Sequence, residues 1–126
     1  MSQLSPTWSL STRTPFWLVV DGVQMAGAWR ARTSREKRIG LLGTDGLTAA
    51  LWIERCSSVH SFGMRYALDL GFLDRAGRVL ATATLERSRL GLPRLRAHSV
   101  LEAPAGRLRD WRVVPGAVLS LVDWID

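Results

Sequence analysis

The sequence predicts a mainly β fold, a small closed β-barrel or sandwich of about seven short strands with one short helix near residues 34–42. Short apolar runs alternate with turn residues along most of the chain, a pattern typical of such folds. A capping box at Thr33 and Glu36 precedes the helical stretch. We expect a single β-rich domain over residues 16–126, preceded by a flexible N-terminal arm over residues 1–15.

Two hairpins are predicted from their turns. Residues 16–20 and 23–31 flank Asp21-Gly22, a pair that supplies the positive φ angles of a two-residue turn. The apolar run 70–73 leads through the turn 74–77 into residues 78–85, and Gly77 suits the left-handed position of that turn.

The remaining elements follow from apolar runs and turn residues. The helix is expected to begin after Thr33 and to stop at Gly43, with Ile39 and Leu42 packed against one end of the β core. The other extended segments are expected at residues 49–53, 98–103, 111–114 and 117–122, with a turn at Gly106 and a type II turn at Pro115-Gly116.

Composition limits the class of protein. The chain has 126 residues, 47% of them hydrophobic, which suits one core. Its net charge of +6 comes almost entirely from Arg, with Lys37 the single lysine, and one cysteine excludes an intrachain disulfide. No apolar run approaches the roughly 18 residues that span a bilayer. The run 16–20 is also too short for the core of an export signal, so we expect a cytoplasmic protein without a cofactor.

A polar cluster directly precedes the second hairpin. Within fourteen residues the chain gathers these five side chains: Cys56, His60, Met64, Arg65 and Asp69. Polar side chains that lead into a rigid element are a common arrangement for a binding site. The sequence therefore predicts a site at this place without identifying its ligand.

The same stretch resembles a known family. The matching residues are Thr33, Glu36, Gly40, Leu41, His60, Phe62, Met64, Arg65, Leu68, Asp69, Phe72, Leu73, Asp74, Gly77, Val79, Val100, Leu101, Glu102 and Gly106. In their order and spacing they resemble the bacterial domain-of-unknown-function family numbered 192. Ala67 departs from the usual Pro, and Ala117 from the usual acidic residue. The resemblance implies a compact, mainly β domain whose relatives are often exported, and it implies no particular activity.

The main functional hypothesis is a binding or accessory module for a small polar ligand or a short peptide. Its polar groups would be His60, Arg65, Asp69 and Glu102, and its aromatic wall would be Trp52, Phe62 and Tyr66. Aromatic walls with a few fixed polar groups are the usual composition of small-ligand sites. The same residues could equally form a buried polar network that holds one end of a barrel shut. The sequence does not separate these two interpretations.

Two catalytic or metal-binding alternatives stay open. Asp69 and Glu102 could act as paired carboxylates of a hydrolase with His60, or could be structural. Cys56, His60 and Met64 would share one face of an extended segment and offer soft ligands for copper, with His98 as a fourth, or could be core residues. Activation of Cys56 or a nearby serine by a histidine is weaker, because no nucleophile elbow surrounds them.

Single-stranded nucleic acid is a further alternative. The Arg pairs 30/32, 87/89, 94/96 and 107/109 are spaced to share one side of a strand, with Trp29 and Trp111 nearby for stacking. Acidic residues interleave with these pairs, and no RNA-binding signature is present.

Overall fold

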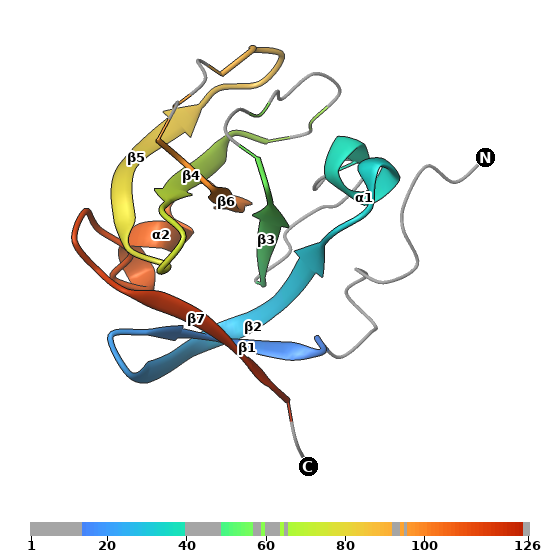
Figure 1. Cartoon of the computed structure of the whole chain (residues 1–126). Helices are drawn as coiled ribbons and strands as arrows, with labels where there is room; N and C mark the ends of the chain where they lie inside the picture. The colour runs from blue at the N-terminus through green and yellow to red at the C-terminus, as the bar shows by residue number, and fades with distance from the viewer. Residues whose placement is uncertain are drawn as a thin grey trace.

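A computed structural model describes residues 14–39, 49–56, 59, 64, 66–91, 94 and 96–124 of the chain. The mainly β prediction is confirmed, since seven strands form one sheet in the order β5-β4-β6-β3-β2-β1-β7 (Figure 1). The elements are β1 (Phe16–Val20), β2 (Val23–Ala31), α1 (Ser34–Ile39), β3 (Ala50–Glu54), β4 (Leu68–Leu73), β5 (Val79–Leu85), β6 (Ser99–Pro104), α2 (Arg107–Asp110) and β7 (Leu119–Asp123).

The sheet curls until its two terminal strands meet at one point. Neighbouring strands pair antiparallel except β2 and β3, which are parallel and are joined through the segment that contains α1. An isolated bridge between Arg78 and Val118 links the starts of β5 and β7. Beside it, the amide of Leu119 donates to the carbonyl of Gly77 at 2.8 Å. The sheet is therefore held together at one corner and is not closed by a continuous ladder.

The local turn and cap predictions are confirmed. The turn between β1 and β2 has Asp21 at φ 49° and Gly22 at φ 85°, and Gly77 between β4 and β5 also has φ 85°. At the start of α1, the hydroxyl of Thr33 accepts from the amide of Glu36 at 3.0 Å. The Glu36 carboxylate accepts from the amides of Thr33 and Arg32 at 3.1 and 3.0 Å. The predicted contacts of Ile39 and Leu42, and the stop at Gly43, lie outside the described side chains and residues.

The turn at Gly106 is found as predicted, but the prediction of an extended segment at residues 111–114 was wrong. Residues 111–114 are not a strand, and the expected turn at Gly106 leads into α2, a second helix of a single turn. Gly106 has φ 94°, and Leu108 and Trp111 of the following segment are buried. Four residues are too few to show helical periodicity, so the need to bury these apolar side chains is visible only in the folded chain.

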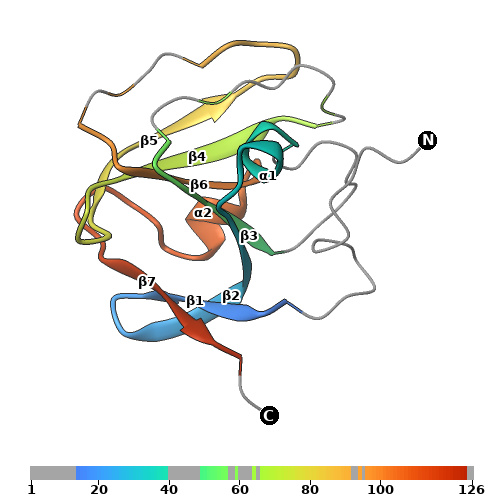
Figure 2. The same cartoon turned by 45° about the vertical axis from the view of Figure 1, so that its right-hand side comes forward.

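Two apolar clusters lie on opposite faces of the sheet. The inner cluster includes Leu18, Leu101 and Leu119, and α2 contributes Leu108 to it. Both views show α2 inside the curve of the sheet, where it contacts β4 and β6 (Figures 1 and 2). The outer cluster covers the other face and consists of Trp29, Ala31, Ala49, Leu51, Ile53, Met64, Leu68, Leu70, Phe72 and Val100. The six residues of β4 are all buried, because both of its faces are covered.

In the described part of the chain, neither helix has the length and apolar character that crossing a membrane would require.

Candidate functional site

Asp69 anchors three elements to one another. It lies on β4, opposite Thr84 of β5 and Ala103 of β6, and 9% of it is exposed. Its Oδ1 accepts from the Thr84 hydroxyl at 2.9 Å, and its Oδ2 accepts from the Gly106 amide at 2.8 Å. The carboxylate therefore fastens β5 and the turn before α2 onto β4, which is a structural role. A carboxylate has about four acceptor positions, so it also keeps capacity for further donors.

A groove of about 520 Å³ opens beside Asp69. Its apolar floor comes from Leu108 and Val113, and its polar wall from Asp69 and the β5 threonines; the full lining is Asp69, Thr82, Ala83, Thr84, Ala105, Gly106, Leu108, Arg109, Val113 and Val114. Gly71 of β4 lies beside this floor, at a distance where a Cβ would make ordinary van der Waals contacts. A Cβ at position 71 would already lie 3.5 Å from Cγ1 of Val113 and 3.7 Å from Cδ1 of Leu108.

Three consecutive residues of β5, from Thr82 to Ala83 to Thr84, line the groove. Successive side chains of a strand point to opposite faces, so a cavity that touches all three reaches the main chain of this strand as well as its side chains. In the sheet order β5 is a terminal strand with β4 as its partner.

Glu102 lies on the other face of the sheet from Asp69. It pairs with Leu70 and Leu51, and both of those residues belong to the outer cluster. Asp69 precedes Leu70 by one residue, so its side chain points to the inner face. Glu102 is 2% exposed and does have an interaction partner. The structure therefore does not bring these two carboxylates together, and the expectation of a shared site is not met for this pair.

The predicted aromatic wall is divided in the same way. Trp52 packs against the inner cluster and Tyr66 against the outer cluster, so these two rings do not face one cavity. Three of the predicted residues, His60, Phe62 and Arg65, lie outside the described residues.

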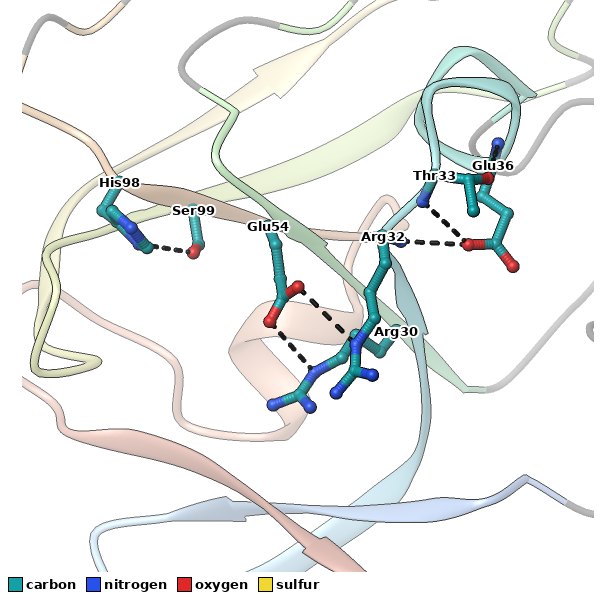
Figure 3. Close-up of polar contacts among 7 residues, drawn as sticks. All are labelled: Arg30, Arg32, Thr33, Glu36, Glu54, His98 and Ser99. Carbon is teal, nitrogen blue, oxygen red and sulfur yellow. Dashed lines mark hydrogen bonds and ion pairs between the residues drawn. The ribbon is translucent and has the colours of Figure 1, made fainter.

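Two predicted metal ligands are packing residues. Met64 is buried within the outer cluster, and Cys56 packs against it, as the structural interpretation of these residues expects. His60 is outside the described residues, and His98 contacts the hydroxyl of Ser99 through Nδ1 at 3.2 Å (Figure 3). Across the described segments, no three His, Cys, Asp or Glu side chains gather in a way that could hold a metal ion.

The two tryptophans of the predicted stacking surface for nucleic acid are buried. Trp29 is 2% exposed and Trp111 is 7% exposed, so neither ring is free to stack on a base. Arg30 and Arg32 do share one side, where both reach Glu54 (Figure 3). The pair 107/109 lies in α2 instead of a strand, which removes the predicted common direction.

Sequence reasoning missed most of the groove. Its lining includes Thr84 of β5, Arg109 of α2 and Gly106, the residue that precedes α2. The alternation of Thr82 and Thr84 with alanines does indicate a strand with one polar side. The polar side of this strand lies next to α2 because of the way the sheet curls, and no local sequence pattern indicates that curvature.

Comparison with known proteins supports the family and the fold. Part of a curated relative aligns: the UPF0127 protein PH1112 of Pyrococcus horikoshii is 38% identical over 50 residues, which are 40% of this chain and 44% of that protein. The match therefore spans less than half of the relative's length.

Two crystal structures share the fold. A protein of unknown function from Novosphingobium aromaticivorans has a TM-score of 0.71 at 19% identity, covering 93% of each chain. A candidate transcription regulator from Sinorhizobium meliloti has a TM-score of 0.74 at 14% identity, covering 90% of this chain and 98% of its own. At these identities the likeness shows the fold alone. The model of DUF192, described as an uncharacterised ACR family, matches residues 18–121, so the chain belongs to that family, as its motifs predicted.

Proposed function

We propose that this domain is a binding module, and that the groove beside β5 accepts an extended peptide segment as an additional strand. The observation that carries the proposal is the coincidence of the groove with the edge of a terminal strand. Addition of a strand to such an edge is a recurring mode of peptide recognition, in which main-chain hydrogen bonds provide affinity and side-chain pockets provide specificity.

The groove offers both kinds of contact. The β5 edge supplies main-chain groups over residues 82–84, and Val113 and Val114 also line the groove. Leu108 and Val113 offer an apolar floor for one side chain of the peptide, while Asp69 and the threonine hydroxyls accept or donate hydrogen bonds. At the start of β5, the Arg78–Val118 bridge and the hydrogen bond from the Gly116 amide to the Val79 carbonyl hold the segment that follows Val113 and Val114 against this strand.

The alternatives have weaker support. A hydrolase that uses Asp69 and Glu102 as a pair needs both carboxylates on one side of a substrate, whereas the strand register assigns them to opposite faces. A sugar site is also less well supported, because none of the described residues that line the groove is aromatic. His60 and Arg65 remain sequence predictions for the same binding function.

The test is a binding titration with defined peptides. We would titrate the ¹⁵N-labelled protein with capped hexapeptides that alternate Val with Thr, Ser or Lys, and follow the amide signals. The expected result is saturable binding with shifts at residues 82–84 and 113–114. A peptide of identical sequence that is N-methylated at every second amide, in the phase that faces β5, lacks the ladder donors and should bind at least about tenfold more weakly.

A pair of variants supplies the matched control. Thr82→Trp fills the groove at an exposed position and should abolish peptide binding, whereas Val23→Trp adds the same ring at an exposed position in the first hairpin and should leave binding unchanged. The proposal fails if no peptide of the set binds, or if the N-methylated peptide binds as well as its parent.

A further inference from the structure

A second cavity, of about 370 Å³, is lined mainly by cations. Its lining residues come from the end of β2, from α1, from the end of β3 and from the residue before β6; they are Arg32, Lys37, Glu54, Arg55 and His98. We refer to this cavity as the basic pocket. It lies at the start of β6, whereas the peptide groove lies beyond the end of that strand, so the two cavities are separate.

The charges that line the basic pocket are not balanced. Glu54 is the one acid among the described residues that line it, and Arg30 from outside the pocket already engages it through Nε at 3.5 Å. Arg32 reaches the other oxygen of Glu54 through Nε at 3.7 Å (Figure 3). These distances exceed those of a charge-assisted hydrogen bond, so the pairing is loose. Within the described part of the chain, no carboxylate pairs with Lys37 or Arg55.

The nearby acid Glu36 does not supply the missing charge. Its carboxylate accepts the amides of Thr33 and Arg32 at the start of α1. Those backbone hydrogen bonds, with that of Thr33 the largest effect, hold the pKa of Glu36 below its ordinary value of 4.5. The carboxylate is thus ionised but committed to the helix cap, and it is not among the residues that line the pocket.

The backbone holds Arg55 and His98 at the pocket. Arg55 has φ 49°, a left-handed conformation that costs a non-glycine residue free energy and that persists where the surrounding structure imposes it. The next amide, of Cys56, donates to the carbonyl of His98 at 3.0 Å, and the amide of His98 donates to the carbonyl of Leu73 at 2.7 Å. The residue that follows Arg55 is therefore hydrogen-bonded to His98, and His98 is hydrogen-bonded to Leu73 at the end of β4.

The ring of His98 is oriented by its neighbour. Its Nδ1 contacts the hydroxyl of the buried Ser99, which leaves Nε2 as the ring atom available to a ligand. His98 also lines a neighbouring cavity of about 490 Å³, whose charged lining residues are Asp74, Arg75 and Arg96. A ligand with its anionic group in the basic pocket thus has space to extend past the imidazole.

We infer that the basic pocket binds a phosphate-type oxyanion, either free phosphate or the terminal group of a small phosphate monoester. Guanidinium groups match the geometry of phosphate oxygens, and an ammonium adds a point charge. A concave site of this size suits a small ligand. A long nucleic acid strand would need the stacking rings that Trp29 and Trp111, both buried, do not provide.

The experiment titrates the full-length ¹⁵N-labelled protein with inorganic phosphate and, separately, with glycerol 3-phosphate, at an ionic strength held constant with sodium chloride. We expect saturable shifts of the amide signals of Arg55, Cys56 and His98 with both probes. Tighter binding of the ester identifies a monoester as the preferred form, and equal binding identifies free phosphate. The inference is overturned if neither probe saturates, or if the shifts lie outside the pocket.

Two matched variants separate the pocket from general charge. Arg55→Gly and Arg112→Gly each remove one cation from an exposed residue with a left-handed φ, of 49° and 59°, where glycine relieves backbone strain. Both proteins should therefore fold. Arg55→Gly should weaken phosphate binding about tenfold, the effect of losing one charge-assisted contact. Arg112→Gly should leave it within about twofold of the parent. Equal weakening by both variants would overturn the inference.

Discussion

The two ends of β6 carry cavities of different construction. Beyond its C-terminal end, the groove is lined by the edge of β5, by apolar residues of the α2 segment and by Asp69, whose two oxygens already accept hydrogen bonds. Before its N-terminal end, the basic pocket is lined by charged side chains from separate segments. One cavity offers main-chain groups and the other offers unbalanced charge, so the same small sheet presents two different kinds of recognition.

The cavities also differ in what holds them in place. The groove depends on contacts between distant strands, namely the junction of β5 with β7 and the bonds of Asp69. The basic pocket depends on short-range features, namely the capping box of α1 and the Cys56–His98 hydrogen bond at the end of β3. Changes at each set of contacts should therefore affect one cavity and spare the other.

The largest effect is expected at the strand junction. A Cβ at Gly77 would collide with the backbone carbonyl oxygen of Leu119, and position 77 is left-handed as well. Gly77→Ala should lower the free energy of unfolding by about 3 kcal/mol, measured by urea denaturation, because both strain and displacement of β7 contribute. Peptide binding should weaken with it, since the junction fixes one end of the groove.

Gly22→Ala is the control for this change. Gly22 has the same φ of 85°, but nothing lies within 4 Å of a Cβ placed there. The Gly22→Ala variant should therefore lose only the free energy that a left-handed conformation costs an alanine, about 1 kcal/mol. Equal losses in the two variants would mean that the contact with Leu119 is not what holds the groove end.

The features that could be predicted from the sequence are the local ones. Asp21-Gly22, Gly77 and the Thr33–Glu36 box each specify a conformation through residues a few positions apart, and each is found as predicted. The strand segments on either side of those turns follow because the turns delimit them. Seven strands and the mainly β class are consequences of these local patterns.

The features that could not be predicted depend on pairing between distant segments. Whether Asp69 and Glu102 share a face is decided by the register of β4 against β6, in which Glu102 meets Leu70. A change of register by one residue would reverse that outcome. The polar lining of the groove and the gathering of Arg55 with His98 arise in the same way, from strand ends that the sheet brings together.

An intermediate effect is expected from Asp69→Asn. Asparagine keeps one acceptor oxygen but loses the charge, so the Gly106 amide or the Thr84 hydroxyl loses its present partner. We expect the free energy of unfolding to fall by about 1.5 kcal/mol. Phosphate binding should not change, because the basic pocket shares no residue with the groove.

Thr84→Val removes only the hydrogen bond from the Thr84 hydroxyl to Asp69, at an exposed position. It should lower the free energy of unfolding by about 0.5 kcal/mol. If Asp69→Asn were no more destabilising than Thr84→Val, the bond to Gly106 would not be what anchors the turn before α2.

The smallest effect is expected from Glu36→Gln at the cap of α1. Glutamine still accepts an amide hydrogen bond, so the loss at pH 7 should be about 0.5 kcal/mol after solvent screening. The pKa of Glu36 is lowered in the folded protein, mainly by the hydrogen bond from the Thr33 amide. Its stabilising contribution is therefore complete above the ordinary value of 4.5 and disappears as the pH falls through the folded pKa.

Urea denaturation of the parent protein and of the Glu36→Gln variant between pH 7 and pH 3 tests this expectation. The difference between their free energies of unfolding should vanish at the acid end. Because α1 carries Lys37 into the basic pocket, the variant should also bind phosphate about twofold more weakly at pH 7, with peptide binding unaffected. A stability difference that grew on acidification would contradict the lowered pKa. Equal weakening of peptide and phosphate binding would show that the two ends of β6 are not independent.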